Sequence, residues 1–90
     1  MRTRILYTGR VQGVGFRATT RSVASNYPIL SGFVRNEPSG QVLVEVQGPP
    51  EQVEAFLSQL HTTMQRNITH IDRAVIPDHQ PAEPAFSIQR

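Results

Sequence analysis

Two segments of helical periodicity, each lying between strand-like segments, are the feature that most restricts how these ninety residues can fold. The longer segment follows Pro49-Pro50-Glu51, a typical helix start with proline in the first turn and a carboxylate near the positive helix end. Its apolar residues recur at the i, i+3, i+4, i+7 spacing of one helix face and are Val53, Phe56, Leu57, Leu60 and Met64. A helix with one apolar face has to pack against another layer.

Strands are predicted in the segments rich in β-branched and aromatic residues, over residues 3–10, 32–35, 41–47 and 68–76, with a short last strand over 86–88. In the third of these strands the alternation places Val42, Val44 and Val46 on one face. The turn Glu37–Gly40 has proline and glycine where a tight turn needs them, so the second and third strands should form an antiparallel hairpin.

The shorter helical segment begins at about Phe16 and should end before Pro28, because the residue before a proline is disfavoured in the α region. Its predicted inner face comprises Phe16, Thr20, Val23, Ala24 and Tyr27. The resulting order is βαββαβ plus a short extra C-terminal strand. This order predicts an α+β, ferredoxin-like sandwich, in which an antiparallel sheet carries both helices on one face.

Size and composition exclude several classes of protein. The length predicts one domain over residues 1–90. The absence of cysteine excludes disulfides and thiolate chemistry. All nine basic residues are arginines, the net charge is +2, and these arginines are scattered rather than clustered as in nucleic-acid binders. There is no apolar run of membrane-spanning length and no signal-peptide pattern. We therefore expect a cytoplasmic monomer without a nucleic-acid or membrane partner.

The segment Gly9–Arg17, called here the glycine loop, joins the first predicted strand to the first predicted helix. Its glycines let successive backbone N–H groups turn inward, and such groups at a helix N-terminus bind anions of phosphate size. Arg17 falls in the first helical turn, where its guanidinium can meet two phosphate oxygens at once. Connections of this kind are also often only tight turns, so the loop by itself leaves both interpretations open.

Two other interpretations of the motifs are weaker. Gly13–Ala18 matches the dinucleotide-binding pattern GxGxxG/A, with Glu37 at about the right distance. However, the strand before Glu37 turns into a hairpin, whereas a dinucleotide-binding unit would continue into another helix. His61, His70 and His79 are evenly spaced but fall at a helix end, in a strand and in a loop, so they predict no metal site.

The glycine loop, with Thr20 three residues after Arg17, resembles the signature of the acylphosphatases. Gly32–Asn36, followed by a turn ending at Gly40 and the strand Val42–Val46, resembles the second motif of that family. The likeness extends over essentially the whole chain. It implies hydrolysis of a small-molecule acyl phosphate to a carboxylate and inorganic phosphate, without a metal or an organic cofactor.

The resemblance also implies a role for each matching residue. Arg17 would bind the phosphoryl group, together with backbone amides of the glycine loop, and Asn36 would orient the attacking water. These amides are those of Gly13, Val14, Gly15, Phe16 and Arg17. Positioning and charge stabilisation suffice for such a reaction because the leaving carboxylate is activated. Neither motif contains a general base, so the phosphate oxygens of the substrate would take the proton of the water.

Two other functions are compatible with this type of fold, and two stretches of the sequence depart from the family pattern. The same fold can serve as a non-catalytic anion-binding module, as at the start of larger hydrogenase-maturation proteins. An RNA-binding module would need stacking aromatics on the central strands, where only Tyr7 and Phe33 are available. Ala18 and Thr19 stand where relatives often carry a bulkier residue. Residues 61–67 lack the Gly-Pro-Pro segment of many relatives, which leaves the conformation of that loop open.

Overall fold

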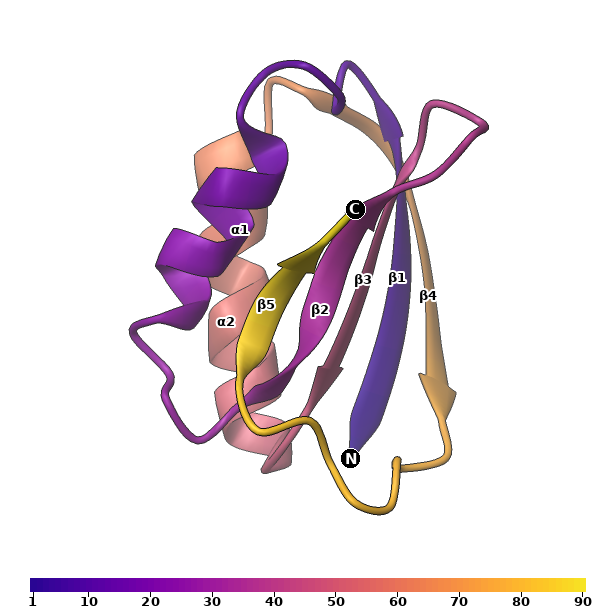
Figure 1. Ribbon diagram of the computed structural model, residues 1–90. Helices are drawn as coiled ribbons and strands as arrows, with labels where there is room; N and C mark the ends of the chain where they lie inside the picture. The colour runs from indigo at the N-terminus through magenta and orange to yellow at the C-terminus, as the bar shows by residue number, and fades with distance from the viewer.

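The computed structural model describes residues 1–90 as one five-stranded sheet with two helices on one face (Figure 1). In chain order the elements are β1 (Arg2–Gly9), α1 (Phe16–Ala24), β2 (Ser31–Asn36), β3 (Val42–Gln47), α2 (Pro50–Met64), β4 (Ile68–Ile76) and β5 (Phe86–Gln89). The predicted ferredoxin-like α+β sandwich is confirmed, and every strand lies within one residue of its predicted bounds. Neither helix is long and apolar enough to cross a membrane.

The sheet has the strand order β4-β1-β3-β2-β5. The first four strands pair antiparallel, as predicted, and β2 and β3 form the predicted hairpin. β5 pairs parallel with β2, so the complete sheet is mixed. Since β1 and β2 both run antiparallel to β3, the strands β1, β2 and β5 all point the same way. Their C-terminal ends therefore lie along one edge of the molecule.

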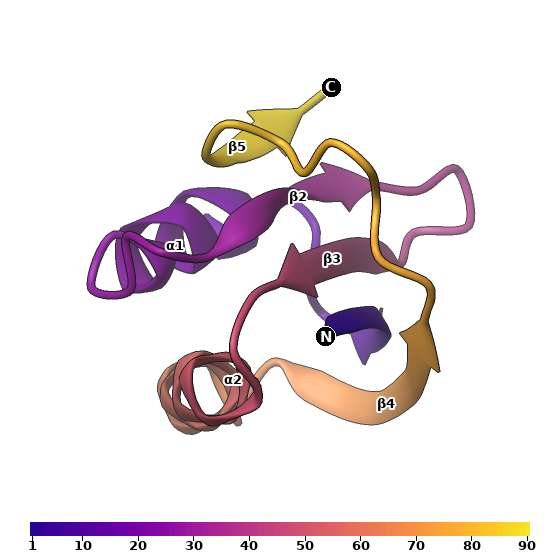
Figure 2. The same cartoon turned by 90° about the horizontal axis from the view of Figure 1, so that it is seen from below.

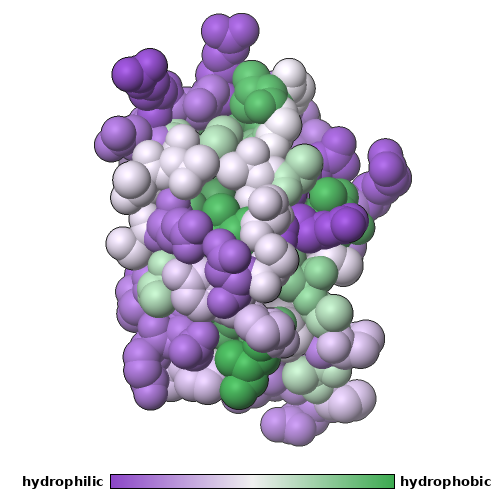
Figure 3. Space-filling model, turned by 90° about the vertical axis from the view of Figure 1, so that its left-hand side faces the viewer, coloured by the Kyte–Doolittle hydropathy of each residue, from purple (hydrophilic) through white to green (hydrophobic).

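The core lies between the sheet and the two helices. The predicted stripe of α2 is buried along its whole length, and the valines of β3 face it. The outward surface of the helices is mostly hydrophilic, with only isolated hydrophobic side chains (Figure 3). The core comprises sixteen buried residues: Ile5, Tyr7, Val11, Phe16, Val23, Ala24, Leu30, Val34, Val42, Val44, Val46, Val53, Phe56, Leu57, Leu60 and Met64.

Helix α1 ends at Ala24, earlier than the position of Pro28 suggests. The N–H of Asn26 donates to Val23 O at 3.0 Å and that of Tyr27 to Ala24 O at 2.9 Å. Such i to i−3 bonds tighten the last turn and satisfy carbonyls that the helix leaves free. The ring of Tyr27 still meets the core, edge-on to Phe56 at a centroid distance of 6.4 Å.

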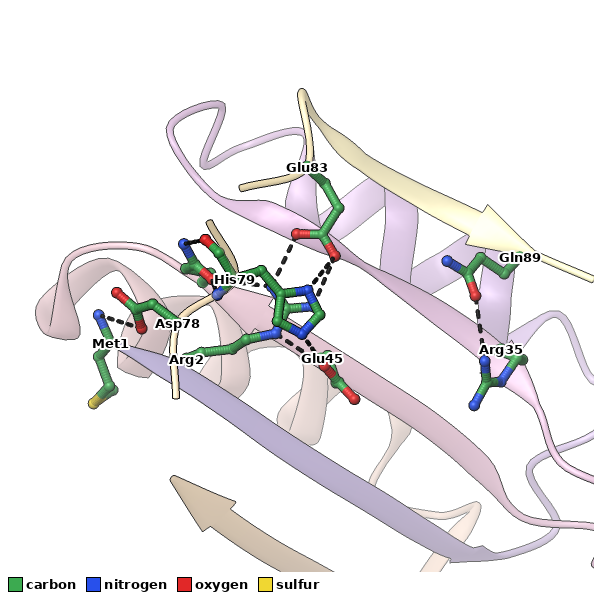
Figure 4. Close-up of polar contacts among 9 residues, drawn as sticks. Met1, Arg2, Arg35, Glu45, Asp78, His79, Glu83 and Gln89 are labelled. Carbon is green, nitrogen blue, oxygen red and sulfur yellow. Dashed lines mark hydrogen bonds and ion pairs between the residues drawn. The ribbon is translucent and has the colours of Figure 1, made fainter. Parts of the chain in front are cut away.

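Residues 77–85, called here the strap, connect β4 at one sheet edge to β5 at the other across the face opposite the helices (Figure 2). A fully buried arginine, Arg2, holds the strap to this face. Its guanidinium donates to Glu45 at 2.9 Å, to Gln47 at 3.1 Å and to both carboxylate oxygens of Glu83 at 2.9 and 2.7 Å (Figure 4). These bonds satisfy a charge that would otherwise be costly to bury, and they lower the pKa of Glu83 to about 2.

Candidate active site

A cleft of about 190 Å³ is lined by residues that follow β1, by the ends of β2 and β5, and by the first turn of α1. Arg17, Asn36 and both predicted glycines, Gly13 and Gly15, are brought together there, although Arg17 and Asn36 come from different motifs. Val14 instead packs against the core. The residues that line the cleft are Val11, Gly13, Gly15, Phe16, Arg17, Ala18, Asn36, Ile88 and Arg90.

Two glycines give the glycine loop its shape. Gly13 has φ of 74° and Gly15 has φ of 80°, both in the left-handed region that other residues adopt only with strain. A Cβ atom at either position would meet nothing within 4 Å. The backbone conformation, rather than a lack of space, therefore requires glycine at these positions.

The backbone N–H groups of this segment are free. From Val11 to Ala18, none of them donates a hydrogen bond within the protein, and the N–H of Thr19 makes the first helical bond, to Gly15 O at 2.9 Å. Gly15 is the N-cap of α1 and supplies no side-chain cap. Free donors at the positive end of a helix dipole are suited to a bound anion.

Replacing Gly15 with alanine should lower the free energy of unfolding by about 1–2 kcal/mol, the cost of a left-handed residue that carries a Cβ. Gly15→Asn should lose less, because asparagine tolerates this region better. Urea denaturation of the three proteins measures the difference. Equal stability of all three would show that the loop relaxes to another conformation at no cost.

Side chains anchor the glycine loop to both neighbouring segments. Gln12 Nε2 donates to Glu37 O at 2.8 Å and to Gln41 O at 2.9 Å, which ties the loop to the β2–β3 turn. The N–H of Arg10 donates to Asn67 O at 2.9 Å, and Asn67 Nδ2 donates back to Arg10 O at 3.1 Å. Residues 61–67, which lack the Gly-Pro-Pro segment, complete α2 as far as Met64. Asn67 then supports the glycine loop through its two hydrogen bonds with Arg10.

Beneath the glycine loop, Tyr7 links β1 to both helices. Its ring packs against Phe16 at 5.1 Å, and its hydroxyl forms a hydrogen bond of 2.8 Å with His61 Nε2. Burial raises the pKa of the Tyr7 hydroxyl and lowers the pKa of His61. Both groups are therefore uncharged at neutral pH, as expected for side chains whose burial disfavours the charged form.

The cleft contains a charged group and a polar group that have no partner within the protein. Arg17 forms no ion pair with any carboxylate of the protein, and no acidic residue lines the cleft. The adjacent Glu37 is engaged by Arg35 Nε at 3.1 Å. Asn36 Oδ1 is buried without a hydrogen-bond partner. Such an amide offers an acceptor and donors that the protein itself does not use.

The three histidines occupy separate environments. His61 contacts Tyr7, His70 lies 3.2 Å from Asp72, and His79 lies within 3.8 Å of Glu45 and Glu83. The guanidinium of Arg2 already holds both of these carboxylates, and no group of three or more potential ligands is placed to hold a metal ion.

Fold and cleft together define a class, the ferredoxin-like α+β proteins whose glycine loop and helix N-terminus suit a small anion. The acylphosphatase family model matches residues 3–88 of the chain. The chain belongs to the acylphosphatase family, whose reaction is the hydrolysis of acyl phosphates.

Individual relatives agree with this assignment. The acylphosphatase of Natronomonas pharaonis is 35% identical over 91 aligned positions, which cover 100% of this chain and 96% of the relative. That of Oceanobacillus iheyensis is 50% identical over 52 residues, 58% of this chain and 56% of the relative. The crystal structure of Bacillus subtilis acylphosphatase superposes with a TM-score of 0.84 at 28% identity, covering 99% and 98% of the two chains.

A further structural likeness is to part of a larger protein. The crystal structure of T. kodakarensis HypF matches 100% of this chain at 28% identity and a TM-score of 0.82. The match covers only 12% of the HypF chain. The same fold thus occurs both in proteins of this length and within a much longer one.

Proposed function

We propose that the chain hydrolyses acyl phosphates in this cleft, with Arg17 and the backbone amides of Gly13–Arg17 binding the phosphoryl group and Asn36 orienting the water. One observation carries the proposal: an unpaired arginine, unbonded amides and an unpartnered asparagine oxygen lie around one cleft that no acidic side chain lines. A dianionic group meets donors and positive charge there without repulsion from an acidic side chain.

In the proposed reaction the water oxygen attacks phosphorus while the bond from phosphorus to the acyl oxygen breaks. The carboxylate leaves with the electron pair of that bond, and the proton of the water passes to a phosphate oxygen. The products are a carboxylate and dihydrogen phosphate, so charge and atoms balance. Fixed amides and a guanidinium stabilise the charge on the equatorial oxygens, which is how proteins generally accelerate phosphoryl transfer.

Asn36 suits the water-binding role because of its place at the end of β2. Its side chain reaches the cleft from the strand opposite α1, while Arg17 and the amides approach from the helix side. An uncharged amide can accept a hydrogen bond from water without repelling the phosphoryl group. A carboxylate at this position would repel it.

Replacing Asn36 with alanine should lower kcat for benzoyl phosphate about 10²-fold, the typical effect of losing one positioned polar group. The release of benzoate, followed by absorbance, measures the rate, and Asn26→Ala, in the exposed turn after α1, is the matched control. Asn36→Asp should be at least as slow because of charge repulsion. An undiminished rate in Asn36→Ala would remove this residue from the mechanism.

The second candidate is a non-catalytic anion-binding module, which the likeness to a small part of HypF favours. The two candidates separate in one assay. A folded chain that binds inorganic phosphate but hydrolyses benzoyl phosphate no faster than buffer would support the binding module. The single-domain boundary at residues 1–90, the monomeric state and the cytoplasmic location stay predictions.

A further inference from the structure

A second arginine, Arg90, lines the cleft at the end of β5. It follows β5 directly, and the parallel register of β5 on β2 pairs Val34 with Ile88 and Arg35 with Gln89. Continued by one residue, this register sets Arg90 beside Asn36. Arg90 and Arg17 therefore line the same cleft from different elements, Arg90 after β5 and Arg17 in the first turn of α1.

Arg90, like Arg17, forms no ion pair with the protein. No acidic side chain lines the cleft, so neither guanidinium has a side-chain carboxylate beside it there. The proposed phosphoryl site already supplies a dianion with one guanidinium and a set of free amides. Arg90 is left to meet a second negative group, one that is not part of the phosphoryl unit being transferred.

Apolar surface lies beside this second cation. Ile88 and Ala18 line the cleft from β5 and α1 respectively. A short methylene chain can pack on such a wall while its charged end reaches the guanidinium. An acyl chain that ends in a carboxylate has this combination of an apolar stem and an anionic end.

We propose that Arg90 selects acyl phosphates whose acyl chain carries a carboxylate a few bonds from the reacting group. This inference rests on the proposed function, because it places the phosphoryl group at Arg17 and the glycine loop. It assigns Arg90 a role in substrate choice rather than in the transfer of the phosphoryl group.

The test compares succinyl phosphate with acetyl phosphate, which lacks the second carboxylate. In Arg90→Gln, the ratio of kcat/KM for succinyl phosphate to kcat/KM for acetyl phosphate should fall roughly 5–30-fold, as expected for the loss of one charge-assisted hydrogen bond. Arg90→Lys should keep part of the preference, and Arg90→Glu should lose more than Arg90→Gln. Arg21→Gln, an exposed arginine of α1 outside the cleft, should leave the ratio unchanged.

An equal fall for both substrates in Arg90→Gln would overturn the proposal, because Arg90 would then serve the phosphoryl group or the fold. An unchanged ratio would overturn it as well. Binding of 3-phosphonopropionate and of ethylphosphonate, measured by calorimetry, gives a readout without turnover. If the native chain hydrolyses neither acyl phosphate, the proposed function fails, yet a preference for 3-phosphonopropionate that is lost in Arg90→Gln still supports the inference, and equal binding overturns it.

Discussion

Substituting glutamine for Arg17 should lower kcat/KM for benzoyl phosphate by about 10²–10³-fold, the effect expected when a preorganised donor at a developing charge is removed. The reason lies in the geometry: Arg17 lines the cleft, has no carboxylate partner, and stands among backbone amides that are all unbonded. Glutamine keeps a polar side chain of similar reach but loses the charge and the two-pronged donor. Steady-state rates at several substrate concentrations separate the effect on kcat from that on KM.

Arg21→Gln is the matched control for Arg17→Gln, since Arg21 is an exposed arginine one turn further along α1 and does not line the cleft. It should retain the native kcat/KM within about twofold, because distant surface charges act only weakly through screened fields. If Arg17→Gln and Arg21→Gln lose activity equally, the effect comes from the general positive potential of α1, and Arg17 has no specific contact with the substrate.

The second large effect concerns stability. Arg2→Met should lower the free energy of unfolding by about 3 kcal/mol, because removing one partner of a buried ion pair leaves the other charges uncompensated. Glu45 and Glu83 would both lose the guanidinium that now bridges them. Urea denaturation measures the change, and Arg4→Met, an exposed position two residues along the same strand, is the control. Equal stability of both variants would show that the strap holds without Arg2.

The difference in unfolding free energy between the native chain and Arg2→Met should shrink as the pH falls below about 5. The pKa of Glu83 falls from its ordinary value of 4.5 to about 2 in the folded protein. The folded state therefore resists protonation of this group, and the stabilisation is complete above about pH 4.5, declines as the pH falls toward 2 and is absent below. The gap between the native chain and Arg2→Met should be constant from neutral pH to about pH 5 and then narrow on acidification.

The fold was largely predictable because its patterns are local. The apolar stripe from Val53 to Met64 and the strand Ile68–Ile76 follow from residues within each element, and both agree with the structure. The burial of Arg2 was not predictable, because its partner Glu83 is 81 residues away. A lone arginine near a chain end has no local pattern that distinguishes a buried side chain from a solvated one.

The candidate site was predictable only on the side that the two motifs encode. Arg17 and Asn36 carry motif signals, and both line the cleft. Ile88 and Arg90 carry no motif signal, because their place in the cleft depends on the parallel pairing of β5 with β2. Arg35 likewise carries no sequence signal for its surroundings: it is half-buried, pairs with Glu37 and lies 5.3 Å from the ring centre of Phe33. Contacts between elements, which the sequence pattern does not specify, decide each of these cases.

The free N–H groups of the glycine loop have a consequence for how the site tolerates change. They belong to the main chain, so exchanging the side chains of Val11, Gln12 or Val14 leaves every donor in place. A systematic alanine scan would therefore overlook most of the groups that we propose to bind the phosphoryl group. Proline alone among the amino acids removes such a donor. The direction of these donors therefore depends on the backbone angles at Gly13 and Gly15 rather than on any side chain that a substitution could remove.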